Sequence, residues 1–173
     1  LQCAPAPRAI AVRAGRLFDS NTGQMLSKQV VLLLGERITD VGPETQLRIP
    51  AGVEVIDLSQ ATVLPGLIDA HTHIYNTRRP EWTTERSTLM AIQNTQADLR
   101  AGFTAARDMT SHGNGYGDVD IRNAINLGDI DGPRLQVAGR GIAWGATPRN
   151  PAVPEDPLAG AIIRSAEEGR AAV

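Results

Sequence analysis

Residues 63–74 read VLPGLIDAHTHI, and this stretch decides the fold. A Pro-Gly turn leads into an apolar run of strand length, and His71 and His73 follow at its end. Successive side chains of a strand point to opposite faces, so the two histidines project together while Thr72 points away. Two imidazoles on one face of a rigid strand can bind one metal ion. The chain has only three histidines, and this pattern places two of them side by side.

A His-x-His triplet also occurs by chance, and alone it more often marks two ordinary polar residues at a strand end than a metal site. Here the surroundings favour the metal site, because the Pro-Gly turn, the apolar strand and an upstream acidic residue occur together. That acidic residue, Asp69, shares the strand face with His71 and His73 but lies deeper. We therefore predict that Asp69 is a hydrogen-bonding support beneath the metal site and not a ligand.

After Pro65 the chain alternates between strand-like and helix-like segments. In order, these are an apolar strand at 67–70, a helix at 84–100, a strand at 103–109, a glycine-rich loop at 111–117, a helix at 119–127 and a strand at 135–138. This order predicts a parallel sheet with right-handed crossovers. We expect a long proline-containing loop at 145–157 to follow, and then a final alanine-rich helix from about Leu158 to the end of the chain.

Before Val63 the pattern is that of a small β domain. Short β-branched runs alternate with turn residues between Ile10 and Leu58. The sequence thus predicts three parts: a disordered or leader-derived terminus at 1–8, a β domain at 9–62 and an α/β segment at 63–173.

Composition excludes several kinds of partner. A net charge of −2 without a basic run gives nucleic acid or an anionic membrane surface little to attract. The longest apolar run, Val30 to Leu34, has strand length, so no membrane span is predicted. Cys3 is the single cysteine, which excludes an intrachain disulfide. The segment before Arg8 is compatible with the end of a secretion leader and leaves localisation open between export and cytoplasm; lipidation of Cys3 is the weaker alternative, because Gln2 departs from the small residue usual there.

The stretch VLPGLIDAHTHI resembles the signature at the first barrel strand of the metal-dependent amidohydrolase superfamily. Other segments resemble the same superfamily, and together they cover nearly the whole chain. They are VRAGRLFD at 12–19, GERITDVG at 35–42 and VEVIDL at 53–58 in a composite β domain, AGFTAARD at 101–108 at the second barrel strand, and DVDIRNA at 118–124 with GPR at 132–134 before the third. The last two segments are similar to the branch that includes imidazolonepropionase-like and Xaa-Pro dipeptidase-like enzymes.

This resemblance implies an α/β fold: the N-terminal part of a (β/α)8 barrel, with its chemistry at the carboxyl ends of the strands, preceded by a small β-sandwich-like domain. Residues 9–62 would be the N-terminal half of that β domain, and 63–173 the first three βα units of the barrel. A barrel of this kind needs roughly 250 residues. We therefore expect the chain to be an incomplete portion of the enzyme.

The resemblance also implies that His71 and His73 bind the more buried of one or two divalent metal ions, with zinc expected. Later strands would add a bridging carboxylated lysine, two more histidines and an aspartate that acts as general base. Lys28 is the only lysine and lies before the first barrel strand. The bridging lysine and the general base are thus expected beyond Val173, and no catalytic residue is predicted within the chain.

Four further positions are candidate site residues. His112 lies in the glycine-rich loop, which is expected to be flexible and to contact or cover the substrate; a solvated loop histidine is an equal alternative. Tyr75 and Trp144 are expected to line the pocket, with packing as the alternative. Asp108, beside Arg107, is a candidate for orienting a metal ligand, but its position favours a structural ion pair over that role.

The function implied is hydrolysis of an amide or peptide-like bond by a metal-activated water, with a substrate such as an Xaa-Pro dipeptide or an N-acyl amino acid. A cyclic amide or lactone hydrolase is the alternative within catalysis. A non-catalytic metal-binding or scaffold fragment is the alternative from another class. The expected partners are the small-molecule substrate, the remainder of the same chain and further copies in a homo-oligomer.

Overall fold

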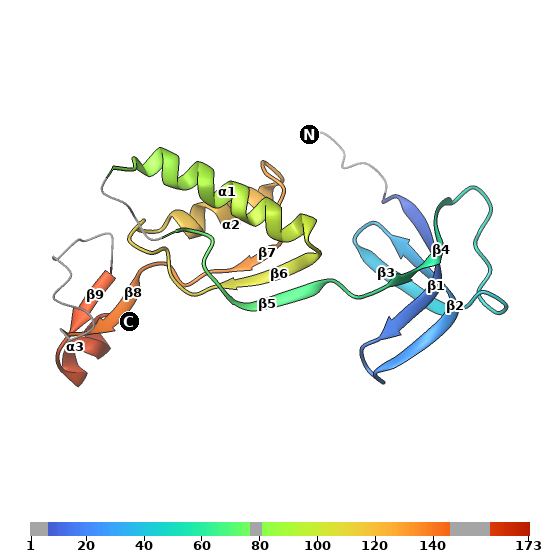
Figure 1. Cartoon of the computed structure of the whole chain (residues 1–173), viewed down its shortest axis with the longest axis horizontal. Helices are drawn as coiled ribbons and strands as arrows, with labels where there is room; N and C mark the ends of the chain where they lie inside the picture. The colour runs from blue at the N-terminus through green and yellow to red at the C-terminus, as the bar shows by residue number, and fades with distance from the viewer. Residues whose placement is uncertain (1–6, 77–80, 146–159) are drawn as a thin grey trace. The chain divides into compact units, whose positions relative to one another are not determined.

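The computed structural model describes residues 7–76, 81–145 and 160–173 (Figure 1). The chain divides into two compact units, Leu1–Pro65 and Gly66–Val173. Cys3 and most of the predicted terminus at 1–8 lie outside the described residues. In the part of the chain that is described, no helix is both long and apolar enough to cross a membrane.

The first unit is a four-stranded sheet in the order β3-β2-β1-β4. Its strands are β1 (Ala9–Asp19), β2 (Gln24–Leu34), β3 (Arg37–Pro43) and β4 (Glu54–Val63). β1 and β2 form an antiparallel hairpin, whereas β4 runs parallel to β1. The β1–β4 register shifts between Ala14 and Arg16, and a Cβ at Gly15 would collide with the Ser59 carbonyl. Only glycine fits this irregular position.

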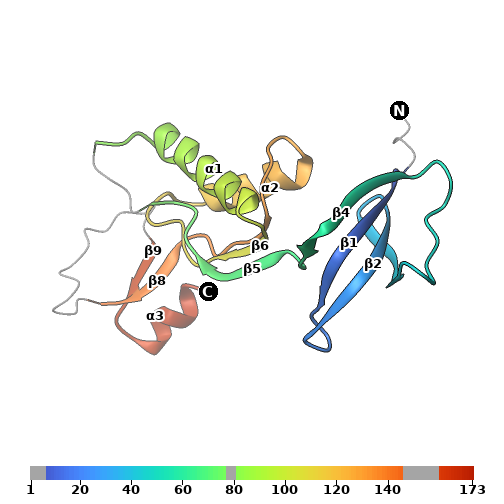
Figure 2. The same ribbon diagram turned by 45° about the vertical axis from the view of Figure 1, so that its right-hand side comes forward.

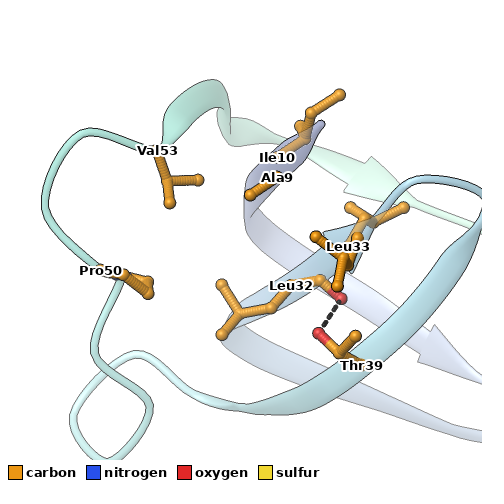
Figure 3. A pocket seen from close by; sticks show the side chains of 8 residues that line it. Ala9, Ile10, Leu32, Leu33, Thr39, Pro50 and Val53 are labelled. Carbon is orange, nitrogen blue, oxygen red and sulfur yellow. Dashed lines mark hydrogen bonds between the residues drawn. The ribbon is translucent and has the colours of Figure 1, made fainter. Parts of the chain in front are cut away.

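Small aliphatic side chains make the core of the first unit. Ala11, Ala14, Val30 and Val31 are buried on the two central strands. Figure 3 shows an apolar pocket of this unit, where side chains from β1 and β2 face the loop that carries Pro50 and Val53. The β-branched runs between Ile10 and Leu58 therefore do lie in a sheet, in agreement with their preference for strands.

The second unit contains a parallel sheet in the order β5-β6-β7 (Figure 2). Its elements are β5 (Leu67–Thr72), α1 (Thr84–Arg100), β6 (Phe103–Asp108), α2 (Gly117–Leu127) and β7 (Arg134–Gln136). The core cluster joins both helices to the sheet and contains Ile74, Tyr75, Ala91, Ala106, Ile121 and Leu135. The predicted order of strand, helix, strand, helix, strand is therefore the order observed.

Local signals explain where the two long helices begin and end. The Thr83 hydroxyl caps α1 by accepting a hydrogen bond from the Arg86 N–H at 3.2 Å. Gly102, directly after the α1 cap, has φ +96°, and Gly128 at the end of α2 has φ +79°. Such left-handed residues stop a helix and favour glycine.

The end of the chain differs from the prediction. In place of a helix from about Leu158, the structure has β9 (Gly160–Ile163), which pairs in parallel with β8 (Gly141–Trp144), and then a short helix α3 (Ala166–Ala171). The adjacent β-branched Ile162 and Ile163 favour the strand. The Ser165 hydroxyl starts α3 by accepting from the Glu168 N–H at 3.1 Å. The predicted loop at 145–157 lies, beyond Gly145, outside the described residues.

Candidate metal centre

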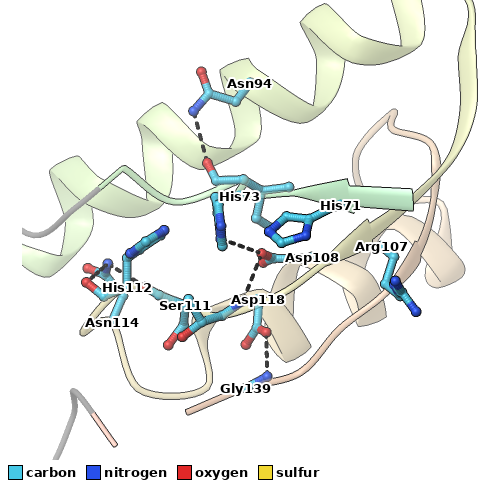
Figure 4. A network of polar contacts seen from close by, with 12 residues as sticks. His71, His73, Asn94, Arg107, Asp108, Ser111, His112, Asn114, Asp118 and Gly139 are labelled. Carbon is cyan, nitrogen blue, oxygen red and sulfur yellow. Dashed lines mark hydrogen bonds and ion pairs between the residues drawn. The ribbon is translucent and has the colours of Figure 1, made fainter. Parts of the chain in front are cut away.

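His71 and His73 lie at the carboxyl end of β5, with their rings near one another (Figure 4). The ring centroids are 5.4 Å apart and the ring planes differ by 80°. Below them, the Asp69 carboxylate accepts a hydrogen bond from the His71 backbone N–H at 3.0 Å. This bond fixes the backbone from which the first imidazole projects, and it is the kind of contact predicted for Asp69.

The separation of the two rings fits shared coordination of one ion. With Zn–N distances of 2.0–2.1 Å and tetrahedral angles, two imidazoles on one zinc have centroids about 5 Å apart. The separation of 5.4 Å between the His71 and His73 rings is close to that value. Within the described residues, however, no group of three or more His, Cys, Asp or Glu side chains could hold a metal. The described residues thus contain this pair of imidazoles and no larger group of metal-binding side chains.

Asp108, the last residue of β6, lies directly behind His73. Its side chain is 0% exposed, and its Oδ1 is 3.8 Å from His73 Nδ1. Its Oδ2 is also buried and has no hydrogen-bond partner. Burial raises the Asp108 pKa to about 6, and the nearby Asp118 adds to this rise. An unpartnered buried carboxylate oxygen is costly, so this site needs a cationic or hydrogen-bonding partner.

Arg107 does not supply that partner. Its Nε donates to the Ala70 carbonyl oxygen at 2.8 Å. The ion pair that Asp108 makes is with His73, so Asp108 does not form the predicted ion pair with Arg107. Asp108 faces His73 instead, which is the orientation expected of a carboxylate that orients a metal-binding histidine.

His112 brings the third histidine of the chain to the same place. Its ring centroid is 4.2 Å from that of His73, with 62° between the planes. Burial lowers the His112 pKa, and the adjacent His73 lowers it further. All three histidines therefore meet beyond the ends of β5 and β6 (Figure 4).

The loop that carries His112 is not the flexible segment expected from its glycines. The Ser111 hydroxyl donates to the Gly115 carbonyl at 2.7 Å, and the Asn114 amide donates to the Ser111 carbonyl at 2.8 Å. Ser111 and Asn114 are both buried. Glycine permits the turns, and the buried side chains then fix them, so the loop is a compact hydrogen-bonded structure.

Tyr75 and Trp144 have very different surroundings. Tyr75 is 1% exposed within the core cluster, and its hydroxyl is 3.2 Å from that of Thr88. This placement corresponds to the packing alternative for Tyr75. Trp144 is 63% exposed at the end of β8.

Two residues at the site were not singled out in the sequence. Asp118, in the first turn of α2, is fully buried and accepts a hydrogen bond from the Gly139 N–H at 2.7 Å. The side-chain amide of Asn94 on α1 donates a hydrogen bond to the backbone carbonyl of Ile74 at 2.9 Å. Ile74 is the residue directly after His73. An acidic residue that follows a glycine-rich loop at a helix start was a visible signal for Asp118. No local signal indicated Asn94, because its partner is distant in the sequence.

Comparison with known proteins gives this geometry a family. The profile described as Amidohydrolase family matches residues 54–144, more than half of the chain. The chain belongs to the amidohydrolase family. This confirms the predicted superfamily, and the fold class is confirmed as the N-terminal part of an amidohydrolase barrel with a β domain before it.

Amidohydrolase relatives are found among both structures and sequences. A crystal structure of a Xaa-Pro dipeptidase with methionine bound in its active site has a TM-score of 0.79 and 28% identity, covering 95% of this chain and 43% of that one. An N-substituted formamide deformylase of Arthrobacter pascens is 52% identical over 48 residues, which are 27% of this chain and 9% of the relative. An imidazolonepropionase of Salmonella schwarzengrund (strain CVM19633) is 38% identical over 60 residues, 34% of this chain and 14% of the relative. The chain thus spans less than half the length of each of these amidohydrolases.

Proposed function

We propose that His71 and His73 are metal ligands of a hydrolase that cleaves an amide or peptide-like bond. The observation that carries this proposal is the pair of imidazole rings at the end of β5, 5.4 Å apart. Zinc suits this pair, because neutral imidazole is among its preferred ligands. When bound there, zinc would polarise the scissile carbonyl and make a bound water a nucleophile near neutral pH.

The residues around the pair have separate tasks in this proposal. The Asp108 carboxylate faces Nδ1 of His73, which favours the tautomer with its proton on Nδ1 and leaves Nε2 free to coordinate. Asp69 holds the His71 backbone through the hydrogen bond from its N–H. These two contacts would favour the coordinating tautomer of His73 and hold the backbone of His71 before a metal binds.

The proposed substrate class is an Xaa-Pro dipeptide or an N-acyl amino acid. Support comes from the similarity to the Xaa-Pro dipeptidase structure, which aligns with 95% of this chain. The formamide deformylase similarity supports the broader class of carbon–nitrogen hydrolysis. The bridging lysine and the general base are proposed to lie in parts of the enzyme outside this chain.

The test is the double variant His71→Ala/His73→Ala in the full-length protein. We expect bound zinc, measured by plasma emission, and turnover of Xaa-Pro dipeptides to be lost together, because both ligands of the pair are removed. The exposed Asp129→Asn on the turn after α2 serves as a charge-changing control and should retain both. Zinc at wild-type stoichiometry in the double variant would contradict the proposed ligands. If the double variant loses zinc but the wild-type protein hydrolyses none of the substrates, the pair would be a non-catalytic metal site.

A further inference from the structure

The loop between β6 and α2 is anchored outside itself as well as within. The Ser111 backbone N–H donates to the Gly139 carbonyl at 3.0 Å. The Gly139 N–H in turn donates to the buried Asp118 carboxylate at 2.7 Å, and the other Asp118 oxygen accepts from the Val119 N–H at 2.9 Å. The loop is therefore tied to the segment after β7 and to the first turn of α2. Its position is set by these two segments as well as by its own internal hydrogen bonds, so it is a fixed support.

His112 sits on this support with an unusual backbone. Its φ is +50°, in the left-handed region, and the following Gly113 has φ +85°. A non-glycine residue in this region costs roughly 1–2 kcal/mol, although histidine tolerates it better than most residues do. Glycine would relieve this cost, yet the loop carries a histidine here. Strain of this kind at a hydrogen-bonded site suggests a task for the side chain.

The rings of His112 and His73 contact one another directly. Their centroids are 4.2 Å apart, closer than the distance of about 5 Å that two imidazoles have on one tetrahedral zinc. The angle of 62° between the ring planes makes this an edge-type contact and not a parallel stack. Figure 4 shows the His73 ring with His112 on one side and Asp108 and His71 on the other.

From this arrangement we propose that His112 is a positioning residue, whose ring packs against His73 and holds that imidazole beside Asp108 in the orientation needed for metal binding. Asp108 alone cannot fix the ring, because 3.8 Å from His73 Nδ1 is too long for a hydrogen bond. The His112 ring supplies a contact with His73 from the opposite side. This inference rests on the proposed function of His71 and His73 as ligands.

The experiment compares three substitutions at one position in the full-length protein. His112→Asn removes the ring and keeps a residue that accepts the left-handed backbone. His112→Gly removes both the ring and the strain, and His112→Phe keeps a ring without nitrogens. The zinc dissociation constant, measured by competition with a chromophoric chelator, should rise about 10- to 100-fold in the Asn and Gly variants. It should stay close to the wild-type value in the Phe variant.

A second readout separates positioning from folding. Thermal unfolding of the zinc-free protein should be unchanged or higher in His112→Gly, because the strained backbone is relieved while zinc affinity still falls. If His112→Asn fails to fold, Ser111→Ala provides a second test. It keeps the His112 side chain but removes a hydrogen bond that holds its loop, so the ring should shift away from His73 and zinc binding should weaken. The exposed Asn123→Ala on α2 is the control and should match the wild type in both measurements.

Two results would overturn the inference while leaving the ligand proposal intact. One is a wild-type zinc affinity in His112→Asn and His112→Gly. The other is an equal loss of affinity in His112→Phe and His112→Asn, because a ring nitrogen and not the ring contact would then be required. If the wild type binds no more zinc than His71→Ala/His73→Ala, the proposed function fails first and this inference fails with it.

Discussion

The two units of the chain bury polar groups very differently. Among the described residues, seven polar or charged side chains are buried, and Gln29 is the one that belongs to Leu1–Pro65. The other six belong to Gly66–Val173, and four of these lie at the end of β6 or in the loop and helix start that follow it. The first unit instead has a core of alanine and valine.

This difference separates a unit built for stability, the first, from a unit that buries polar groups near the candidate site, the second. Burying a polar group costs free energy unless it is fully hydrogen-bonded. The first unit largely avoids that cost. The second accepts it chiefly at the end of β6 and in the loop and helix start that follow, where one Asp108 oxygen has no hydrogen-bond partner. The comparison therefore predicts that core substitutions in the first unit will lower stability without changing zinc binding, and that substitutions at the buried polar groups of the second unit will change zinc binding.

The largest expected effect is at Asp108. Asp108→Asn should weaken zinc binding by up to about 100-fold, because an amide turned toward His73 favours the wrong imidazole tautomer. The zinc-free protein should become more stable at pH 8, since burial raises the Asp108 pKa to about 6 and the charged form is the disfavoured one. Chelator competition and thermal unfolding measure the two effects. If zinc affinity and the stability of the zinc-free protein both fell, or both rose, the proposed separation of metal binding from stability would be wrong.

The next effect is expected at Gly117, the first residue of α2. A Cβ there would collide with the hydroxyl of Tyr75, a side chain that is fully buried and cannot move aside. Gly117→Ala should therefore lower the free energy of unfolding by about 1–3 kcal/mol. Urea denaturation followed by circular dichroism measures this loss.

The matched control for Gly117 is Gly128, at the other end of the same helix. A Cβ at Gly128 meets no atom within 4 Å, and only its φ of +79° opposes the substitution. Gly128→Ala should cost roughly 1 kcal/mol through backbone strain alone. An equal loss in both variants would exclude the Tyr75 contact as the cause.

A smaller and purely structural effect is expected in the first unit. Val30 is fully buried at the centre of β2. Val30→Ala removes two methyl groups and should lower unfolding stability by about 1.5 kcal/mol, with no change in zinc affinity of the folded protein. Weaker zinc binding in this variant would show that the first unit does affect the metal site.

Much of the fold was readable in the sequence because its signals are local. The helix Thr84–Arg100 was predicted with the bounds that it has, since Gly102 follows its end; the structure adds the Thr83 cap at its start. The pairing of β8 with β9 was missed because the two strands are distant in the sequence. The predicted final helix was right for Ala166–Ala171 but began too early, because the alanine content of the segment was given more weight than the adjacent Ile162 and Ile163.

In the candidate site too, the local part was predictable from the sequence and the long-range part was not. His71 and His73 come close because strand geometry places alternate residues on one face. The approach of His112 to His73 depends on hydrogen bonds that link Ser111 to Gly139 and Gly139 to Asp118. Contacts of this kind join segments that follow different strands, so no local pattern reveals them. The same is true of Tyr75, whose burial depends on how both helices pack.

The amide of Asn94 links α1 to the end of the strand that carries the two histidines. Asn94 grips the carbonyl of Ile74, the residue that immediately follows the second imidazole. Through this bond a rotation of α1 would be transmitted to the backbone beside His73. A substitution on the exposed side of α1, such as at Leu89, therefore offers a way to alter the orientation of that imidazole without changing any residue that contacts it.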